Sequence, residues 1–229
     1  MKSVRWQAAA LLLACSAGAA LPPPPPTGRV EGRVTLLDGG RPRSDASNVV
    51  VWIEATRVDG HAAPALTMTS EHKRFTPRVV AVEAGRPVSF PNQDPIFHNV
   101  FSVSGENRFD LGLYRSGRSK EKTFAAPGLV RVYCNIHPQM VGYVRVVDSS
   151  FSTVTGPNGV FAFDGIPAGA RVIRAWCEPG GETTEPVVVR PNQTASAALS
   201  FDVSAFHPQP HKNKYGQDYP PPPPDEDRY

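Results

Sequence analysis

The stretch "LVRVYCNIHPQMVGYVRVV", residues 129–147, determines how the middle of the chain folds. Apolar and polar side chains alternate over 129–134, and the run 141–147 is rich in valine, so the pattern predicts two β-strands. The residues between them, 135–140, are predicted to form the connecting loop. Because side chains alternate between the two faces of a strand, Cys134 is expected on the same face as the valines at 130 and 132. His137 and Met140 would then lie on a tight loop beside a half-buried thiol.

The rest of the chain has the same character. Its 229 residues are 40% hydrophobic and 20% charged, which is the composition of a globular protein. Short runs rich in Val, Phe and Tyr are separated by Gly, Pro, Asn and Asp, and this punctuation predicts an all-β sandwich. The Asn158-Gly159 pair predicts a type I′ hairpin turn, because both residues tolerate positive φ. Further predicted strands cover 28–37, 48–54, 78–83, 88–91, 160–163, 172–176 and 186–189.

Both ends of the chain are expected to lie outside the fold. Residues 1–20 combine basic residues, a short apolar run and small residues, which predicts an export signal. In an alternative interpretation, the residues before Cys15 resemble a bacterial lipobox, and Cys15 would carry a lipid anchor. Residues 21–27 are a proline-rich linker, and the proline-rich tail 205–229 is predicted to be disordered. The histidines at 61, 72, 207 and 211 are expected to be exposed.

Charge and hydropathy exclude some partners. The formal net charge of +3 falls to +1 when the signal residues Lys2 and Arg5 are removed. The sequence has no basic stripe with interleaved aromatic residues, so we do not expect nucleic-acid binding. After the signal, no stretch is long and apolar enough to predict a transmembrane span. The mature protein is therefore expected in the bacterial periplasm or anchored by lipid at the cell envelope.

Four side chains form a candidate metal-binding set: His98, Cys134, His137 and Met140. Imidazole and thiolate ligands suit copper, zinc or nickel, and two histidines with one cysteine and a weak axial methionine form the blue-copper electron-transfer geometry. Each residue alone has an ordinary structural explanation. A disulfide between Cys134 and Cys177 is an alternative in an exported protein, although it leaves the spacing of the histidine and methionine unexplained.

At these residues the chain resembles the cupredoxin family. The segments "FPN" at 90–92, "HNV" at 98–100, "PG" at 127–128 and "CNIHPQM" at 134–140 carry the resemblance, which is closest to amicyanin- and plastocyanin-like proteins. It implies a Greek-key β-sandwich with one mononuclear type 1 copper site. His98, Cys134 and His137 would be the strong ligands and Met140 the axial ligand. Asn99 would support the cysteine loop by hydrogen bonding.

The flanking segments are similar to the two halves of a carboxypeptidase-regulatory-like, or prealbumin-like, β-sandwich. The resemblance is carried by "GRVEGRVTLLDGG" with "VVVWIE", and by "TGPNGVFAFDGIPAGARVIRAW". It implies a first part at 28–63, a cupredoxin domain at 64–148 and a second part at 149–204. The cupredoxin would be inserted between the two halves, or the segments would be consecutive units.

Electron transfer is the expected function, with copper cycling between Cu(I) and Cu(II). The exposed edge of His137 would be the electron port, surrounded by an apolar docking surface for a transient redox protein. That surface would comprise Pro95, Phe97, Ile136 and Pro138. A copper carrier or sensor at the envelope is the alternative. The sequence has no His-x-His pair for further copper, so we do not expect an enzyme. The basic residues at 115, 118, 120 and 122 form either a solvated hairpin or a docking patch for an acidic partner.

Overall fold

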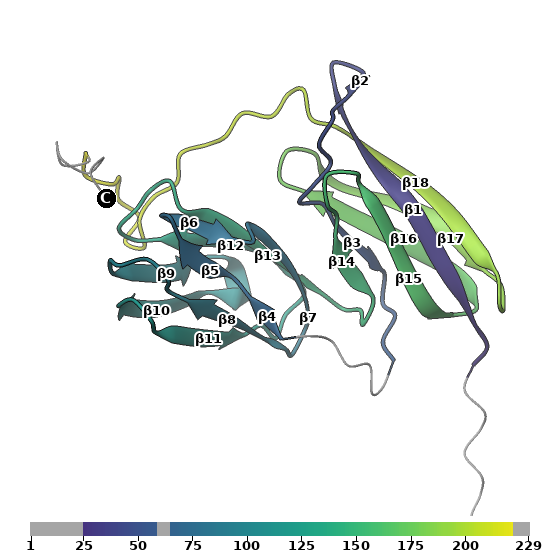
Figure 1. Cartoon of the computed structure of the whole chain (residues 1–229), viewed down its shortest axis with the longest axis horizontal. Coiled ribbons are helices and arrows are strands. Elements are labelled where there is room, and N and C mark those ends of the chain that lie inside the picture. The colour runs from purple at the N-terminus through teal and green to yellow at the C-terminus, as the bar shows by residue number, and fades with distance from the viewer. Residues whose placement is uncertain (1–24, 59–64, 222–229) are drawn as a thin grey trace, which may run out of the picture.

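The computed structural model describes residues 25–58 and 65–221, so the predicted export signal, Cys15 and His61 lie outside the described residues. The described chain is all-β, as predicted, and builds two packed sandwiches (Figure 1). We call residues 65–148 the inserted sandwich, and residues 27–58 with 149–203 the flanking sandwich. No helix among the described residues has the length and apolar character needed to cross a membrane.

The flanking sandwich contains strands from both sides of the inserted segment. One sheet has the order β15-β1-β18, with β2 paired to β1, and the other has the order β14-β3-β16-β17. The chain therefore leaves this sandwich after β3 and returns to it at β14, with residues 65–148 between the two strands. The strands are β1 (Thr27–Asp38), β2 (Arg41–Pro42), β3 (Val50–Ile53), β14 (Ser152–Val154), β15 (Val160–Pro167), β16 (Gly169–Cys177), β17 (Gly181–Val189) and β18 (Thr194–Asp202).

The inserted sandwich packs a five-stranded sheet, β10-β9-β12-β13-β7, against a three-stranded sheet, β11-β8-β4, and carries the small β5-β6 hairpin. Its elements are β4 (Leu66–Thr67), β5 (Thr69–Glu71), β6 (Arg74–Thr76), β7 (Val79–Glu83), β8 (Pro87–Pro91), β9 (His98–Ser102), a 3₁₀ turn (Gly105–Asn107), β10 (Phe109–Tyr114), β11 (Ser119–Thr123), β12 (Gly128–Cys134) and β13 (Val141–Val147).

Strand β12 illustrates how the sequence pattern forms the larger sheet of the inserted sandwich. Val130, Val132 and Cys134 alternate with Arg131 and Tyr133, and the first three are fully buried in the core of the inserted sandwich. Such alternation places one face of a strand against apolar neighbours and leaves the other face for polar contacts. The thiol is therefore held by the same packing that forms the sheet.

A second apolar layer joins the two sandwiches. Tyr143 and Val147 of β13 face outward from the inserted sandwich and pack with Trp52 and Trp176 of the flanking sandwich. The Arg145 guanidinium lies 4.7 Å from the Trp52 ring centre and forms an ion pair with Glu182 at 2.6 Å. Since β13 is buried on both faces, the flanking sandwich directly supports the strand that follows the predicted metal loop.

Two local expectations differ from the structure. The Asn158-Gly159 turn connects β14 and β15, which belong to different sheets, and only Gly159 has positive φ, at 66°. It is therefore not a type I′ hairpin. The tail, which we expected to be disordered, is placed over residues 205–221 and lies against the inserted sandwich (Figure 1). His211 is accordingly half-buried rather than exposed, whereas His72 and His207 are exposed as expected.

Candidate metal centre

Three buried donor side chains meet at one end of the inserted sandwich, and the buried Met140 follows on the same loop. His98 is the first residue of β9, Cys134 is the last residue of β12, and His137 and Met140 belong to the loop before β13. Strands β9 and β12 pair directly, with Cys134 opposite Val100. This register carries the imidazole of His98 to the thiol although the two residues lie 36 positions apart in sequence.

The three strongest donors converge on one point. The Cys134 Sγ atom lies 3.6 Å from Nδ1 of His98 and 3.6 Å from Nδ1 of His137, and the two Nδ1 atoms are 3.2 Å apart. Donor atoms bound to one ion at about 2.0–2.3 Å are separated by roughly 3.2–3.9 Å at trigonal or tetrahedral angles. The spacing therefore fits a single metal ion between the three side chains.

The loop that carries the remaining candidates is closed by its own backbone. The N–H of Met140 donates to the carbonyl of His137 at 3.0 Å, and the N–H of Cys134 donates to the carbonyl of Met140 at 3.3 Å. Met140 is fully buried in the same apolar cluster as Cys134. A thioether held there is a soft donor of the kind that copper accepts.

Asp94, which no sequence motif indicated, orients one of the imidazoles. Its Oδ2 atom lies 2.7 Å from Nε2 of His98, and its carboxylate also accepts the N–H groups of His72 and Lys73 at 2.6 and 2.9 Å. Because the carboxylate accepts the Nε2 proton, it leaves Nδ1 of His98 as the lone-pair atom that faces the thiol.

These contacts also set the protonation states. Burial lowers the pKa of His98, although the Asp94 carboxylate opposes that shift, so the ring is neutral at pH 7. Burial raises the pKa of Asp94, but hydrogen bonds from the N–H of Lys73, from His98 and from the N–H of His72 outweigh it and hold the pKa below its usual value. A neutral imidazole beside an ionised carboxylate is the form that can bind a metal.

Opposing influences act on the thiol. Burial raises the pKa of Cys134, while the backbone N–H groups of Asn99, Ile136 and His137 lower it. Three donors aimed at one sulfur atom would stabilise a thiolate once a cation is present. In the metal-free protein, burial therefore favours the neutral thiol. With a cation bound, the three backbone N–H groups would support the thiolate.

Asn99 supports the loop mainly through its backbone. Its carbonyl accepts the N–H of Asn135 at 2.9 Å, whereas its side-chain amide donates to Asp110 at 2.6 Å. The expected link between this position and the cysteine loop is therefore present as a backbone bond, and the side chain is directed to β10.

The expected docking residues are divided by exposure. Phe97 and Ile136 are 52% and 43% exposed, and Pro95 and Pro138 are also exposed. His137 is only 4% exposed, so much less of its edge lies at the surface than an exposed electron port would need. The basic residues divide as well: Arg115 and Arg118 are exposed in the turn beside the 92–97 loop, while Lys120 and Lys122 lie along β11.

The other candidate features do not form a second centre. Cys134 and Cys177 are both free thiols, so they are not joined in a disulfide.

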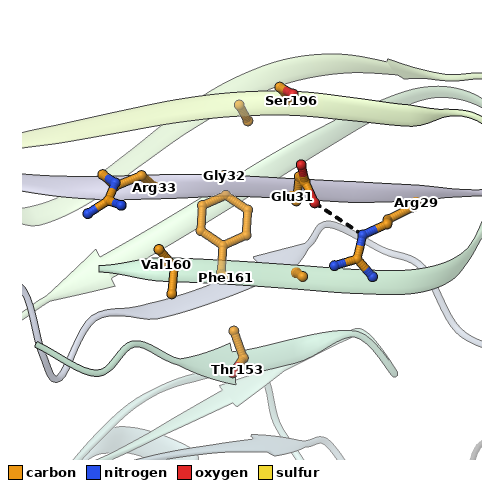
Figure 2. Close-up of a pocket in the computed structure, with 10 residues that line it drawn as sticks. Arg29, Glu31, Gly32, Arg33, Thr153, Val160, Phe161 and Ser196 are labelled. Carbon is orange, nitrogen blue, oxygen red and sulfur yellow. Dashed lines mark hydrogen bonds and ion pairs between the residues drawn. The ribbon is translucent and has the colours of Figure 1, made fainter. Parts of the chain in front are cut away.

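A surface pocket on the β15-β1-β18 sheet is lined by arginines that already have partners (Figure 2). Arg29 pairs with Glu31 and Asp164, and Arg33 donates to the carbonyl of Asn158. Gly32 lies under the Phe161 ring there, and a Cβ atom at that position would come within 2.5 Å of the ring. Within 25–58 and 65–221, the cluster of histidine, cysteine or acidic side chains spaced for a metal is the one at His98, Cys134 and His137.

No protein-family model and no curated protein matches the sequence. Solved structures similar to part of the chain include a purple cupredoxin from Nitrosopumilus maritimus, with 22% identity, a TM-score of 0.32, and coverage of 35% of this chain and 98% of that chain. A reduced amicyanin variant has 24% identity, a TM-score of 0.34, and coverage of 42% and 97%. A copper-containing nitrite reductase from Thermus scotoductus SA-01 has 23% identity and a TM-score of 0.34 over 50% of this chain and 28% of its own. Cupredoxins are thus among the solved structures that this chain is similar to.

Proposed function

We propose that this protein is an exported electron-transfer protein with one type 1 copper ion held by His98, Cys134, His137 and Met140. The observation that carries the proposal is the convergence of three buried donor atoms, all within 4.8 Å of one another. Two imidazoles and a thiolate with a nearby buried thioether match the ligand preference of copper in electron-transfer sites. Bound copper would supply a one-electron redox couple.

The protein's own residues would keep that site unchanged between the two oxidation states. Asp94 fixes the ring of His98, backbone amides support the Cys134 sulfur, and the loop is closed by the bonds between Cys134, His137 and Met140. Ligands that are already positioned need little rearrangement when an electron arrives or leaves. Burial of all four side chains would also keep water away from a bound copper ion.

A transient redox partner would dock on the apolar surface formed by Pro95, Phe97, Ile136 and Pro138. All four side chains are exposed, Phe97 precedes His98 in the chain, and Ile136 and Pro138 flank His137. Small apolar patches suit brief association. Arg115 and Arg118 lie in the adjacent turn, which is bonded to the 92–97 loop through Asn92. Their charge favours an acidic partner and an association rate that falls as salt rises.

The absorption spectrum of the copper-loaded mature protein tests the proposal. We expect an intense visible band from charge transfer between the Cys134 thiolate and Cu(II). Met140→Leu should retain copper and raise the reduction potential, because a weak donor to Cu(II) is lost. Met68→Leu is the matched control, since Met68 is another fully buried methionine in the same core and should leave the potential unchanged. A Cu(II)-loaded protein without the visible band would refute the electron-transfer assignment.

A further inference from the structure

The C-terminal tail crosses from one sandwich to the other. After β18 ends, the chain leaves the flanking sandwich and runs over to the end of the inserted sandwich that holds the candidate metal loop (Figure 1). Residues 211–219 then contact β12, the metal loop and β10. A proline-rich segment of this composition would be disordered without such contacts.

The contacting part of the tail is organised by its own hydrogen bonds. The side-chain oxygen of Asn213 accepts the N–H groups of Tyr215 and Gln217 at 2.9 and 3.0 Å. Lys212 and Asp218 form an ion pair at 2.6 Å across the same turn. The turn therefore brings His211 and Tyr219 together, with ring centres 5.2 Å apart in an edge-to-face arrangement.

These two aromatic residues bind the backbone of the metal loop. His211 stacks on Tyr133 at a centroid distance of 4.0 Å, and its Nε2 donates to the carbonyl of Pro138 at 2.8 Å. The Tyr219 hydroxyl donates to the carbonyl of Cys134 at 2.9 Å. The bonds that close the loop use the carbonyls of Asn99, His137 and Met140, so the tail binds two different carbonyls.

Lys214 adds two contacts beside them. Its backbone N–H donates to the side chain of Asn135 at 3.0 Å, and its ammonium group pairs with Asp110 at 2.7 Å. Asp110 is also the acceptor for the side chain of Asn99. The tail thus contacts the start and the middle of the loop and is linked through Asp110 to Asn99, the residue next to His98. Phe97 and Ile136 stay open to solvent.

We propose that His211 and Tyr219 are positioning residues for the metal centre, which clamp the ligand loop from its side and leave the docking surface open. This inference rests on the proposed copper function for its meaning, although the clamp itself is a property of the metal-free protein. The bound loop cannot swing His137 or Met140 away from the site without breaking the contacts at Cys134 and Pro138. In this arrangement the flanking sandwich holds the start of the tail, and the tail extends from it to the metal loop.

Matched substitutions in the full chain test the clamp. Tyr219→Phe removes the hydroxyl that binds Cys134, and His211→Phe removes the bond to Pro138 but retains an aromatic ring. Tyr215→Phe and His207→Phe are the controls, because Tyr215 is 71% exposed and His207 is exposed in the same tail. We measure copper release to a competing chelator, the reduction potential and the Cu(II) spectrum. Loss of one hydrogen bond should speed copper release about fivefold, and the double variant should release it faster still. We also expect the potential and the visible band to shift in the two test variants and to stay at wild-type values in the two controls.

Hydrogen exchange on the metal-free protein separates this proposal from the copper assignment. Amide exchange at residues 135–140 should be faster in Tyr219→Phe than in wild type or Tyr215→Phe. If wild type shows no thiolate–copper band but the loop amides respond in this way, the copper function fails and the clamp stands. If neither loop exchange nor copper release distinguishes the test variants from their controls, the clamp is overturned.

Discussion

The two described cysteines occupy similar places in two different sandwiches. Cys134 ends β12 and Cys177 ends β16; they are 0% and 2% exposed, and burial raises the pKa of both thiols. Cys177 belongs to the apolar core of the flanking sandwich, and its sulfur is supported by one backbone N–H, from Gly180. Cys134 has two imidazole nitrogens at 3.6 Å and three backbone N–H groups. A strand end and burial therefore provide only a packed thiol, and the surrounding donors make Cys134 part of a candidate metal site.

Removing each thiol in turn gives the largest contrast. Cys134→Ala should abolish the thiolate–copper band, because the thiolate proposed to bind copper is lost. Cys177→Ala should keep the full band and lower the free energy of unfolding by about 1–2 kcal/mol through lost core packing. The visible spectrum and a denaturation curve of each variant measure these effects. A Cys134→Ala protein that stays blue would contradict the assignment of Cys134 as a ligand. A colourless Cys177→Ala protein would contradict the claim that Cys177 is only a packed core thiol.

The next largest effect is expected at Asp94, the carboxylate beside His98. The surroundings of Cys177 contain no such residue among the contacts described above. Asp94→Asn removes the charge that fixes the lone pair of Nδ1, so copper affinity should fall roughly 10–100-fold. Asp218→Asn is the control, because Asp218 is exposed and pairs with Lys212 in the tail turn. Competition titration with a copper chelator gives the affinities. Equal affinity in wild type and Asp94→Asn would show that the ring is fixed by packing alone.

Ionisation of the Cys177 thiol should lower the free energy of unfolding of the copper-loaded protein at alkaline pH. Burial raises its pKa to about 11, so the unfolded state loses this proton near pH 9 while the folded state keeps it. Stability therefore falls as pH rises between about 9 and 11, by up to about 2 kcal/mol. Cys177→Ala should lack this part of the loss. Denaturant unfolding of both proteins at several pH values measures the difference, and parallel curves would mean that the thiol ionises equally in both states.

The smallest effect is expected at Asn99. Asn99→Ala removes the side-chain bond to Asp110 but keeps the backbone bond to Asn135, so stability should fall by about 1 kcal/mol. Copper affinity should change less than about twofold, because the loop contact is retained. Thermal unfolding and the same chelator titration provide both values. A large loss of copper would assign the loop support to the side chain instead.

Much of this site could be predicted because its parts obey local rules. Alternation over 129–134 and the valine-rich run after Met140 predicted the two strands, and the short loop between them then had to bring Cys134, His137 and Met140 together. His98 was a candidate by residue type, but its assignment as a ligand of the same site rested on the resemblance, since no local rule gives the pairing of Cys134 with Val100. That pairing depends on how distant strands assemble.

The parts that were missed depend on contacts that the sequence does not display. Asp94 lies in an irregular loop whose path is set by Asn92, which accepts the N–H of Asp94 and donates to the carbonyl of Ile96. The tail has the composition of a disordered segment, and its order depends on Tyr133 and Pro138, each more than seventy residues earlier in the chain. Such partners become apparent only in the folded molecule.

The pairing of β1 with β18 has a consequence for how the protein is made. These strands run parallel over Arg29–Leu37 and Thr194–Asp202, so the first described strand has to wait during synthesis for the last described one. The inserted sandwich lies wholly between them and can complete its own sheets earlier. Because contacts between distant segments form slowly, the inserted sandwich should mature first and the outer sheet should close afterwards. A chain stopped before β18 would therefore carry a formed metal loop beside an unpaired, aggregation-prone strand edge.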